Sequence, residues 1–379
     1  MVQNGEQTTA MDLIYLMSCA VNEKKPSSER CAKMDLEAVL KFAKLHLLSA
    51  TAAYALEKTV PLPTEWQDAK AASIRKTIIF NSERAKVLQA LDENGIWYLP
   101  LKGCILKDYY PKAAMREMAD NDILCDGNRM SDVKKIMLIL GYRCVEFGRS
   151  KHDVYHKKNM NFEMHKTLFN PVISPAFASY FENIKDRLIK DEGNQFGYHL
   201  KDEDFYIHSL CHMYFHYNDA GIGLRALLDV YVMNKKKRQL MDWDYIRREL
   251  ERLELNSFEQ EVRSLADRTF SLEPLSPEEQ KQLTILINST CFGLYSSYLA
   301  KRMAHIDSRA AKRKYIFRRF FPDSNYLRIN YPTVYRYKIL YPFLLVFRLF
   351  HGLIIRRKRL IQEYKMLKQC QTQDSSAVS

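Results

Sequence analysis

Two aspartates lie close enough in the sequence to share a chemical task. Asp120 and Asp122 are two residues apart in DNDILC, a short segment typical of a β-strand. Side chains two apart on a strand point to the same face. Two such carboxylates repel each other unless a divalent cation lies between them. The pair therefore predicts a metal site, although Asp-x-Asp is also a common surface sequence.

A third carboxylate, Glu163, lies about forty residues later. Residues 159–165, NMNFEMH, alternate polar and apolar side chains, which predicts a half-buried strand with Glu163 and His165 on its polar face. If this strand lies beside the strand with the two aspartates, the three carboxylates converge. Such a set could bind two Mg²⁺ (or Mn²⁺) ions, with Glu163 completing the second ion's site and helping to activate an attacking hydroxyl.

A lysine and a glycine precede the aspartates by about seventeen residues. Lys102 and Gly103 follow a predicted strand and begin a short predicted helix. Backbone N–H groups at such a turn can bind phosphate oxygens. We therefore expect this turn to bind phosphate groups.

These segments together resemble a known family. LPLKGCILKDYYPKAAMREMADNDILCD, followed by FEMHKTL, is similar to the uncharacterised bacterial nucleotidyltransferases of the polymerase-β superfamily. The resemblance covers roughly residues 10–255. It implies Mg²⁺-dependent (or Mn²⁺-dependent) transfer of a nucleoside monophosphate from a nucleoside triphosphate to an unknown hydroxyl acceptor, with release of pyrophosphate. The implied metal-binding and catalytic residues are Asp120, Asp122 and Glu163, and the implied nucleotide-binding residues are Lys102, Gly103 and Arg116.

Two positions depart from the superfamily pattern. Cys104 follows Gly103 where Gly or Ser is usual, and Asn121 stands between the aspartates where an apolar residue is usual. Asn121 would point to the core side of its strand. These departures leave an alternative: a catalytically degenerate nucleotidyltransferase-fold binding module, membrane-peripheral in surface-polysaccharide assembly.

The resemblance extends to a histidine-rich helix and the helix after it. His208, His212 and His216 recur every four residues on one helix face, followed by Arg225 and Asp229. Histidines packed against a neighbouring element are a simpler interpretation than a metal site. Arg225 and Asp229 are most simply an i,i+4 ion pair on a helix surface, although Arg225 could instead reach a phosphate.

Three further side chains are candidates for contacting a substrate, namely His165, His212 and Arg225.

Composition and periodicity predict the fold class. Only 12 of 379 residues are Gly and 12 are Pro, which favours a mostly helical chain. Helical spacing of apolar residues dominates, whereas strand patterns gather between residues 95 and 170. We predict an α+β protein in which a small mixed-sheet core of nucleotidyltransferase type is embedded among helices. The predicted segments are 1–95 (helical), 96–170 (core), 171–300 (helical) and 301–379 (basic helical extension with a frayed tail).

The positive charge lies at the end of the chain. The net charge is +13, and residues 301–379 hold 18 Lys and Arg against 4 Asp and Glu. Basic clusters within 312–359 bracket an apolar run too short to span a membrane. The segment suits protein docking or an anionic membrane surface, and nucleic acid is the least favoured partner.

Cysteine usage indicates the compartment. The eight cysteines form no CxxC pair, and the first residues do not resemble a signal peptide. We expect a cytoplasmic protein, with peripheral association at the inner membrane face as an option.

Overall fold

The structure is a computed structural model that describes residues 4–219, 221–290 and 309–354. Contacts divide the chain into one compact unit, residues 1–215 and 222–291, and a second unit, residues 216–221 and 292–379. The predicted boundary at residue 300 falls outside the described residues.

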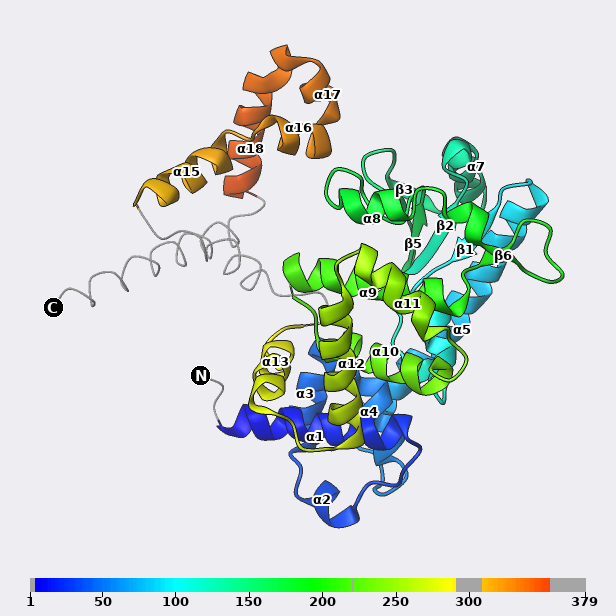
Figure 1. The fold of residues 1–379 in the computed structure, drawn as a ribbon, viewed down its shortest axis with the longest axis vertical. Helices are drawn as coiled ribbons and strands as arrows, with labels where there is room; N and C mark the ends of the chain where they lie inside the picture. Colours follow the sequence, from blue (N-terminus) through cyan, green and yellow to red (C-terminus); the bar gives the residue numbers. More distant parts are fainter. Residues whose placement is uncertain (1–3, 220, 291–308, 355–379) are drawn as a thin grey trace. The chain divides into compact units, whose positions relative to one another are not determined.

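The α+β prediction is confirmed, and the five strands of the main sheet all lie between residues 98 and 165 (Figure 1). They are β1 (Tyr98–Pro100), β2 (Asn121–Cys125), β3 (Arg143–Glu146), β4 (His152–Lys157) and β5 (Met160–His165). Their order is β1-β2-β5-β4-β3. β2 and β5 are parallel and the other neighbouring pairs are antiparallel, so the sheet is mixed, as predicted. A separate two-stranded sheet, which the sequence analysis did not predict, pairs β6 (Ile189–Lys190) with β7 (Tyr198–His199).

Helices make up most of the remaining first unit. They are α1 (Asn4–Val21), α2 (Ser28–Ala32), α3 (Leu36–His46), α4 (Ser49–Leu56), α5 (Thr64–Glu93), α6 (Gly103–Leu106), α7 (Met130–Ile139), α8 (Pro175–Tyr180), α9 (Asp202–Asp219), α10 (Leu224–Lys237), α11 (Trp243–Arg252), α12 (Asn256–Ser271) and α13 (Pro277–Ile287). Local signals set several ends. Asp35 accepts a hydrogen bond from Ala38 N–H at the start of α3, and Ser276 forms a capping box with Glu279 at the start of α13.

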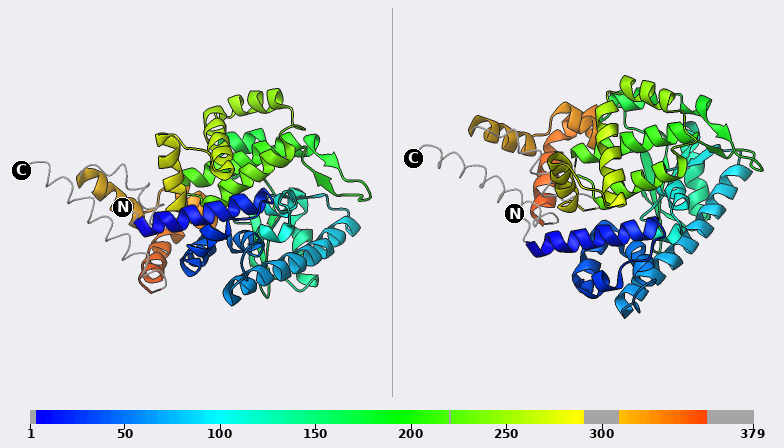
Figure 2. Two further views of the ribbon diagram at one scale, coloured as in Figure 1. Left: turned by 90° about the horizontal axis from the view of Figure 1, so that it is seen from below. Right: turned by 60° about the horizontal axis from the view of Figure 1, so that its bottom comes forward.

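The sheet has two differently covered faces. On one face, Ile123 and Phe162 pack into a buried cluster with Phe80 of α5 and Val133 of α7. On the other, Leu124 belongs to a second cluster that includes Phe205 of α9. Figures 1 and 2 show α5 as the long light-blue helix beside the strands. Asp122 of β2 and Glu163 and His165 of β5 project from the α9 side.

The predicted N-terminal and C-terminal helical segments pack together in this unit. Ser18 Oγ on α1 donates to the carbonyl oxygen of Phe270 at 2.6 Å, and Asn22 Nδ2 donates to the same oxygen at 3.0 Å. Tyr231 on α10 donates through its hydroxyl to Asn22 Oδ1 at 2.8 Å. These buried contacts join α1, α10 and α12 across more than 200 residues of sequence.

The second unit is described over residues 309–354. Its helices are α15 (Arg309–Phe320), α16 (Ser324–Asn330), α17 (Pro332–Arg336) and α18 (Tyr341–Ile354). No helix in the described ranges is both long enough and apolar enough to cross a bilayer.

Candidate functional site

The sheet brings two of the predicted acidic residues side by side. Asp122 on β2 is the register partner of Glu163 on the parallel strand β5. Register partners on adjacent strands point to the same face, so both carboxylates project from the α9 side. Asp120 lies two residues before Asp122, directly ahead of β2, and burial together with the charge of Asp122 raises its pKa. The fold thus brings the three carboxylates to one face of the sheet, the arrangement expected if the two strands are neighbours.

Asp122 contacts two basic side chains. Lys102 Nζ lies 2.6 Å from Asp122 Oδ1, and His165 Nε2 lies 2.8 Å from the same oxygen. Asp122 and His165 are both buried. Burial acts to raise the pKa of Asp122, but Lys102 and His165 outweigh it and hold the pKa well below its usual range. Asp122 is therefore a buried carboxylate that stays ionised.

Lys102 reaches Asp122 from an unusual backbone conformation. Its φ is 47° and its ψ is −118°, and Cys104 N–H donates to the Leu101 carbonyl oxygen at 3.0 Å. These values match the first central position of a type II′ turn, which favours glycine. A lysine there is strained by on the order of 1–3 kcal/mol, and such strain gathers at functional sites. Burial acts to lower the pKa of Lys102, but Asp122, Asp120 and Glu163 together raise it above its ordinary value.

Gly103 is required by a close approach. A Cβ added at this position would clash with the Arg116 guanidinium and lie 3.2 Å from the Met118 side chain. The predicted phosphate-binding glycine therefore makes room for an arginine packed beneath the turn.

Arg116, predicted to bind nucleotide, forms a bidentate ion pair in the structure. Its Nε and Nη2 donate to the two carboxylate oxygens of Asp229 on α10 at 2.8 and 2.9 Å. The Tyr110 hydroxyl donates to Asp229 Oδ1 at 2.7 Å. This clasp joins the loop after the Lys-Gly turn to α10.

The expected i,i+4 surface pair between Arg225 and Asp229 was therefore wrong. Asp229 is taken by Arg116 and Tyr110, and Arg225 Nη1 donates to the Glu117 carbonyl oxygen at 3.0 Å. Both side chains of α10 face the loop that leads into β2, because tertiary partners bind them more strongly than a pair on an exposed helix would. Arg225 also interacts electrostatically with Asp120.

Glu163 lies between two histidines. Its Oε2 is 3.4 Å from His152 Nδ1 and 3.6 Å from His165 Nε2. His152 begins β4 and is the register partner of His165 across the antiparallel pair. Sequence reasoning missed His152. The signal that could have found it lies in HDVYHK, residues 152–157, where a branched and an aromatic residue stand among polar ones, as in a strand.

Two more basic side chains missed as site residues face the same carboxylates. Lys151 donates through Nζ to the Leu168 carbonyl oxygen at 3.1 Å. Burial, with Lys102 nearby, lowers the pKa of Lys151 to about 8. His208 on α9 is buried, and burial together with Lys102 and Lys151 lowers its pKa to about 3. A neutral His208 and a readily deprotonated Lys151 thus border the acidic group.

On the histidine-rich helix, His208 packs against neighbouring side chains, as the simpler interpretation of the sequence expected. Its ring lies 5.7 Å from Phe169 and 5.8 Å from Phe181, edge to face. His212, half-buried, lies one turn further on with its ring 6.4 Å from that of His208. Over residues 4–219, 221–290 and 309–354, the group of three His, Cys, Asp or Glu side chains with all ligand atoms within 4.8 Å is instead His152, Glu163 and His165.

The carboxylates repel one another in the absence of a cation. Burial and the charge of Asp122 raise the pKa of Asp120 to about 6. A divalent ion would remove this repulsion, and oxygen ligands of this kind suit Mg²⁺ or Mn²⁺. The residues present therefore fit a metal-binding role.

The surroundings of Asn121 explain how a polar residue is accommodated between the two aspartates. It is fully buried on the α5 side of the sheet, as predicted, and accepts a hydrogen bond from Arg84 Nη1 of α5 at 3.0 Å. Cys104 Sγ lies 3.6 Å from the same Asn121 oxygen. The two unusual residues therefore contact each other and α5, on the face opposite the carboxylates.

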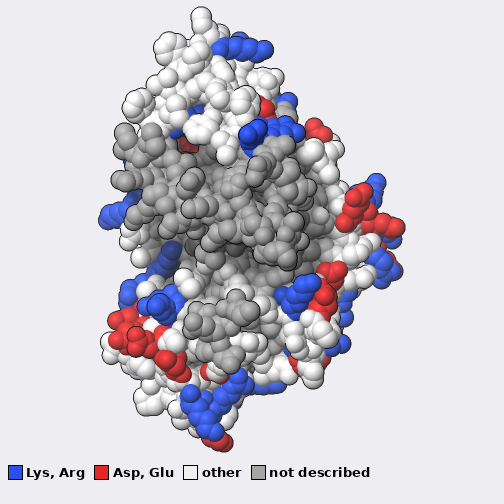
Figure 3. All heavy atoms as spheres, turned by 90° about the vertical axis from the view of Figure 1, so that its left-hand side faces the viewer, with Lys and Arg blue, Asp and Glu red and all other residues white. Residues whose placement is uncertain are grey.

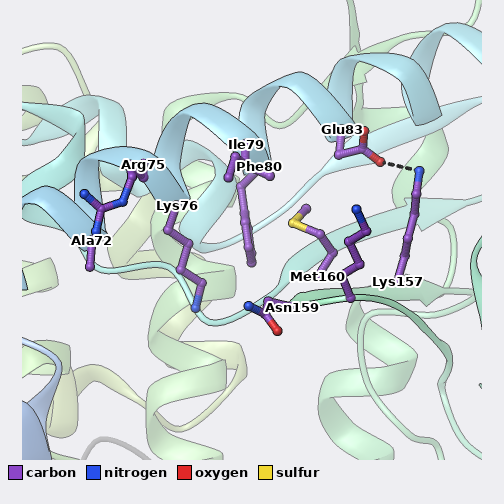
Figure 4. Close-up of a pocket in the computed structure, with 10 residues that line it drawn as sticks. Ala72, Arg75, Lys76, Ile79, Phe80, Glu83, Lys157, Asn159 and Met160 are labelled. Atoms are coloured by element: carbon purple, nitrogen blue, oxygen red, sulfur yellow. Dashed lines mark hydrogen bonds and ion pairs between the residues drawn. The ribbon is translucent and has the colours of Figure 1, made fainter.

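A cationic cavity of about 610 Å³ lies between α5 and the turn that joins β4 to β5 (Figure 4). Ile79, Phe80 and Met160 give it an apolar wall. Its charged lining is Arg75, Lys76, Lys157, Lys158 and Glu83, and Glu83 is paired with Lys157 at 2.9 Å. Lys76 also interacts electrostatically with Asp120. The cavity suits an anionic group attached to an apolar body.

The mixed sheet surrounded by helices is consistent with the nucleotidyltransferase-type core that the sequence predicted. The sequence model of a family described as uncharacterised nucleotidyltransferase matches residues 32–271, more than half of the chain. The protein belongs to this family. Comparison with curated proteins and with solved structures gave no significant match. Family membership supports nucleotidyl transfer as the general activity.

Proposed function

We propose that this protein transfers a nucleoside monophosphate from a nucleoside triphosphate to a hydroxyl acceptor. The acceptor oxygen forms a bond to the α-phosphorus, the bond from the α-phosphorus to the bridging oxygen breaks, and pyrophosphate leaves with that oxygen. The hydroxyl proton passes to Glu163 or to water. The in-register pairing of Asp122 with Glu163, with Asp120 two residues away, is the observation that carries this proposal.

Bound Mg²⁺ or Mn²⁺ would neutralise phosphate charge and lower the pKa of the attacking hydroxyl. Asp120, Asp122 and Glu163 would hold the ions. Lys102 now neutralises Asp122. Once that carboxylate binds a cation, Lys102 is released to hold the β- and γ-phosphates, with Lys151 as a second cation beside it. This is catalysis by positioning and electrostatic stabilisation.

Calorimetric titration with an α,β-methylene nucleoside triphosphate tests the proposal without knowledge of the acceptor. We expect binding in Mg²⁺ that is at least about tenfold tighter than in EDTA, and loss of that difference in Asp122→Asn. Asp153→Asn is the matched control. Asp153 lies on the opposite face of the same sheet, where it accepts from Gly148 N–H at 2.6 Å, and an asparagine oxygen can accept the same bond. Metal-independent binding in the unaltered protein would contradict the proposal.

The alternative of a membrane-peripheral binding module has one observation in its favour. On α18, the side chains of Phe343, Val346, Phe347 and Phe350 follow helical spacing, and each is more than half exposed. Residues 309–354 hold ten Lys and Arg and one Asp. Around these helices, at the top of Figure 3, uncharged atoms predominate, with Lys and Arg beside them. An apolar helix face with cationic neighbours suits an anionic membrane surface.

Vesicle sedimentation separates this role from the enzymatic one. We expect the full chain to bind vesicles containing phosphatidylglycerol more strongly than neutral vesicles, and Phe343→Ser/Phe347→Ser to bind severalfold more weakly. Equal binding to both kinds of vesicle would refute the membrane role. A protein that binds vesicles but shows no metal-linked nucleotide binding would be the degenerate module.

A further inference from the structure

Glu163, His152 and His165 form a compact group of three side chains that can bind metals, in which one carboxylate oxygen of Glu163 contacts both imidazole rings. The distances from Glu163 Oε2 to His152 Nδ1 and His165 Nε2 are 3.4 and 3.6 Å. Both exceed the usual 2.7–3.2 Å of an N–H···O hydrogen bond. They equal the ligand-to-ligand edge of a tetrahedron with metal–ligand bonds of about 2.0–2.2 Å, which is about 3.3–3.6 Å.

The group stands on strands rather than on loops. His152 and His165 are register partners on β4 and β5, and their rings lie 4.9 Å apart, edge to face. Glu163 is two residues from His165 on the same face of β5. The backbone ladder therefore fixes all three side chains, as a preorganised metal site requires.

One ligand atom lacks a partner. His152 Nδ1 is buried and makes no hydrogen bond to a described residue. An orphaned imidazole nitrogen that faces a carboxylate is costly unless something binds it.

We infer that His152, Glu163 and His165 bind a divalent first-row transition metal of the Zn²⁺ type in preference to Mg²⁺. Two imidazole nitrogens and one carboxylate oxygen are a zinc donor set that leaves a fourth position open, whereas Mg²⁺ prefers oxygen ligands alone. His165 Nε2 would exchange its contact with Asp122 for the metal. The inference rests on the proposed function only in sharing Glu163 with it.

Direct metal titration tests this inference on the full chain after removal of metals with EDTA and dialysis. With Zn²⁺ as the probe, we expect one ion per chain, bound at least about 100-fold more tightly than Mg²⁺. His152→Ala should weaken Zn²⁺ binding by about 100-fold or more. His156→Ala is the matched control, because His156 lies four residues along the same strand and on the same face, and it should leave Zn²⁺ affinity unchanged.

Two results would overturn the inference: equal Zn²⁺ affinity in the unaltered protein and in His152→Ala, or Zn²⁺ affinity no greater than Mg²⁺ affinity. If His152→Ala does not fold, the visible absorption of Co²⁺ in the unaltered protein decides, since tetrahedral nitrogen-oxygen ligation gives intense bands and octahedral oxygen ligation does not. The two proposals fail separately. Loss of the Zn²⁺ preference with intact Mg²⁺-linked nucleotide binding would overturn only the transition-metal site.

Discussion

The two faces of the central sheet differ although they alternate along the same two strands. Phe162 and Met164 of β5 are fully buried against α5 and α7, whereas Glu163 and His165, on the other face, contact polar side chains. Apolar burial stabilises the fold, and a carboxylate held beside another carboxylate does not. The comparison teaches that successive residues of one strand have different roles here: those facing α5 stabilise the fold, and those facing α9 form the candidate site.

The largest expected effect separates the two faces by activity. Glu163→Gln keeps the shape of the side chain but removes a metal-binding charge. We expect nucleotidyl transfer to fall by about 10³-fold or more, on the order of 4 kcal/mol of transition-state stabilisation. The melting temperature should change little, because Glu163 is only partly buried and its repulsion by Asp122 is offset by His165, His152 and Lys102. Pyrophosphate release and calorimetric melting measure the two quantities, and a variant that melts much earlier would break the comparison.

Phe162→Ala changes the residue next to Glu163 and is expected to lower stability rather than activity. Phe162 has no exposed surface and packs edge to face against Tyr142 at 5.2 Å. Removing a buried phenyl ring costs about 3–5 kcal/mol of the free energy of unfolding. Urea unfolding measures this loss. A cost below about 1 kcal/mol would mean that the α5 face is not the stabilising one.

His46 provides a pH measurement away from both faces. It is fully buried on α3, its Nδ1 accepts a hydrogen bond from Leu224 N–H at 3.2 Å, and burial lowers its pKa to about 4. The unfolded chain therefore binds a proton that the folded chain does not between about pH 6.5 and 4. Stability contributed by the neutral ring is present above pH 6.5 and is lost as the pH falls toward 4.

The size of that loss is on the order of 3 kcal/mol. In His46→Gln the amide oxygen can accept the same hydrogen bond but does not titrate. We expect its free energy of unfolding to fall less steeply with acidification. Identical pH slopes in the variant and the unaltered protein would contradict the assignment.

The smallest expected effect concerns the polar exception on the apolar face. Asn121→Ala removes the oxygen that accepts a hydrogen bond from Arg84 Nη1. Arg84 keeps its second hydrogen bond, from Nη2 to Asn81 Oδ1 at 2.7 Å. We expect a loss of about 1–2 kcal/mol in stability, because a partly buried guanidinium loses one of its partners. A double-mutant cycle with Arg84→Met measures the coupling. Coupling near zero would show that Asn121 is tolerated rather than used.

Local pattern was enough to predict the alternation of β5 and the placement of Asp122 and Glu163 on one face, because a strand has a fixed period of two residues. The pattern also predicted that Asn121 faces the core. It could not reveal the pairing of Arg116 with Asp229, since these residues are joined only by the packing of α10. His152 was missed for the same reason: its role arises from the pairing of β4 with β5.

The positive φ of Lys102 was likewise beyond prediction. A lysine in a glycine-favouring conformation is stable only where surrounding contacts fix it, and those contacts are Asp122 and the packing around Gly103.

The clasp of Arg116, Tyr110 and Asp229 also limits how the chain can be divided. A fragment ending near residue 170 would keep the arginine and lose the aspartate 113 positions later. The Arg116 guanidinium would have lost its partner, and Leu124 would be exposed to solvent without α9. We expect such a fragment to aggregate rather than fold. Recombinant work on this protein should therefore begin with both halves on one polypeptide.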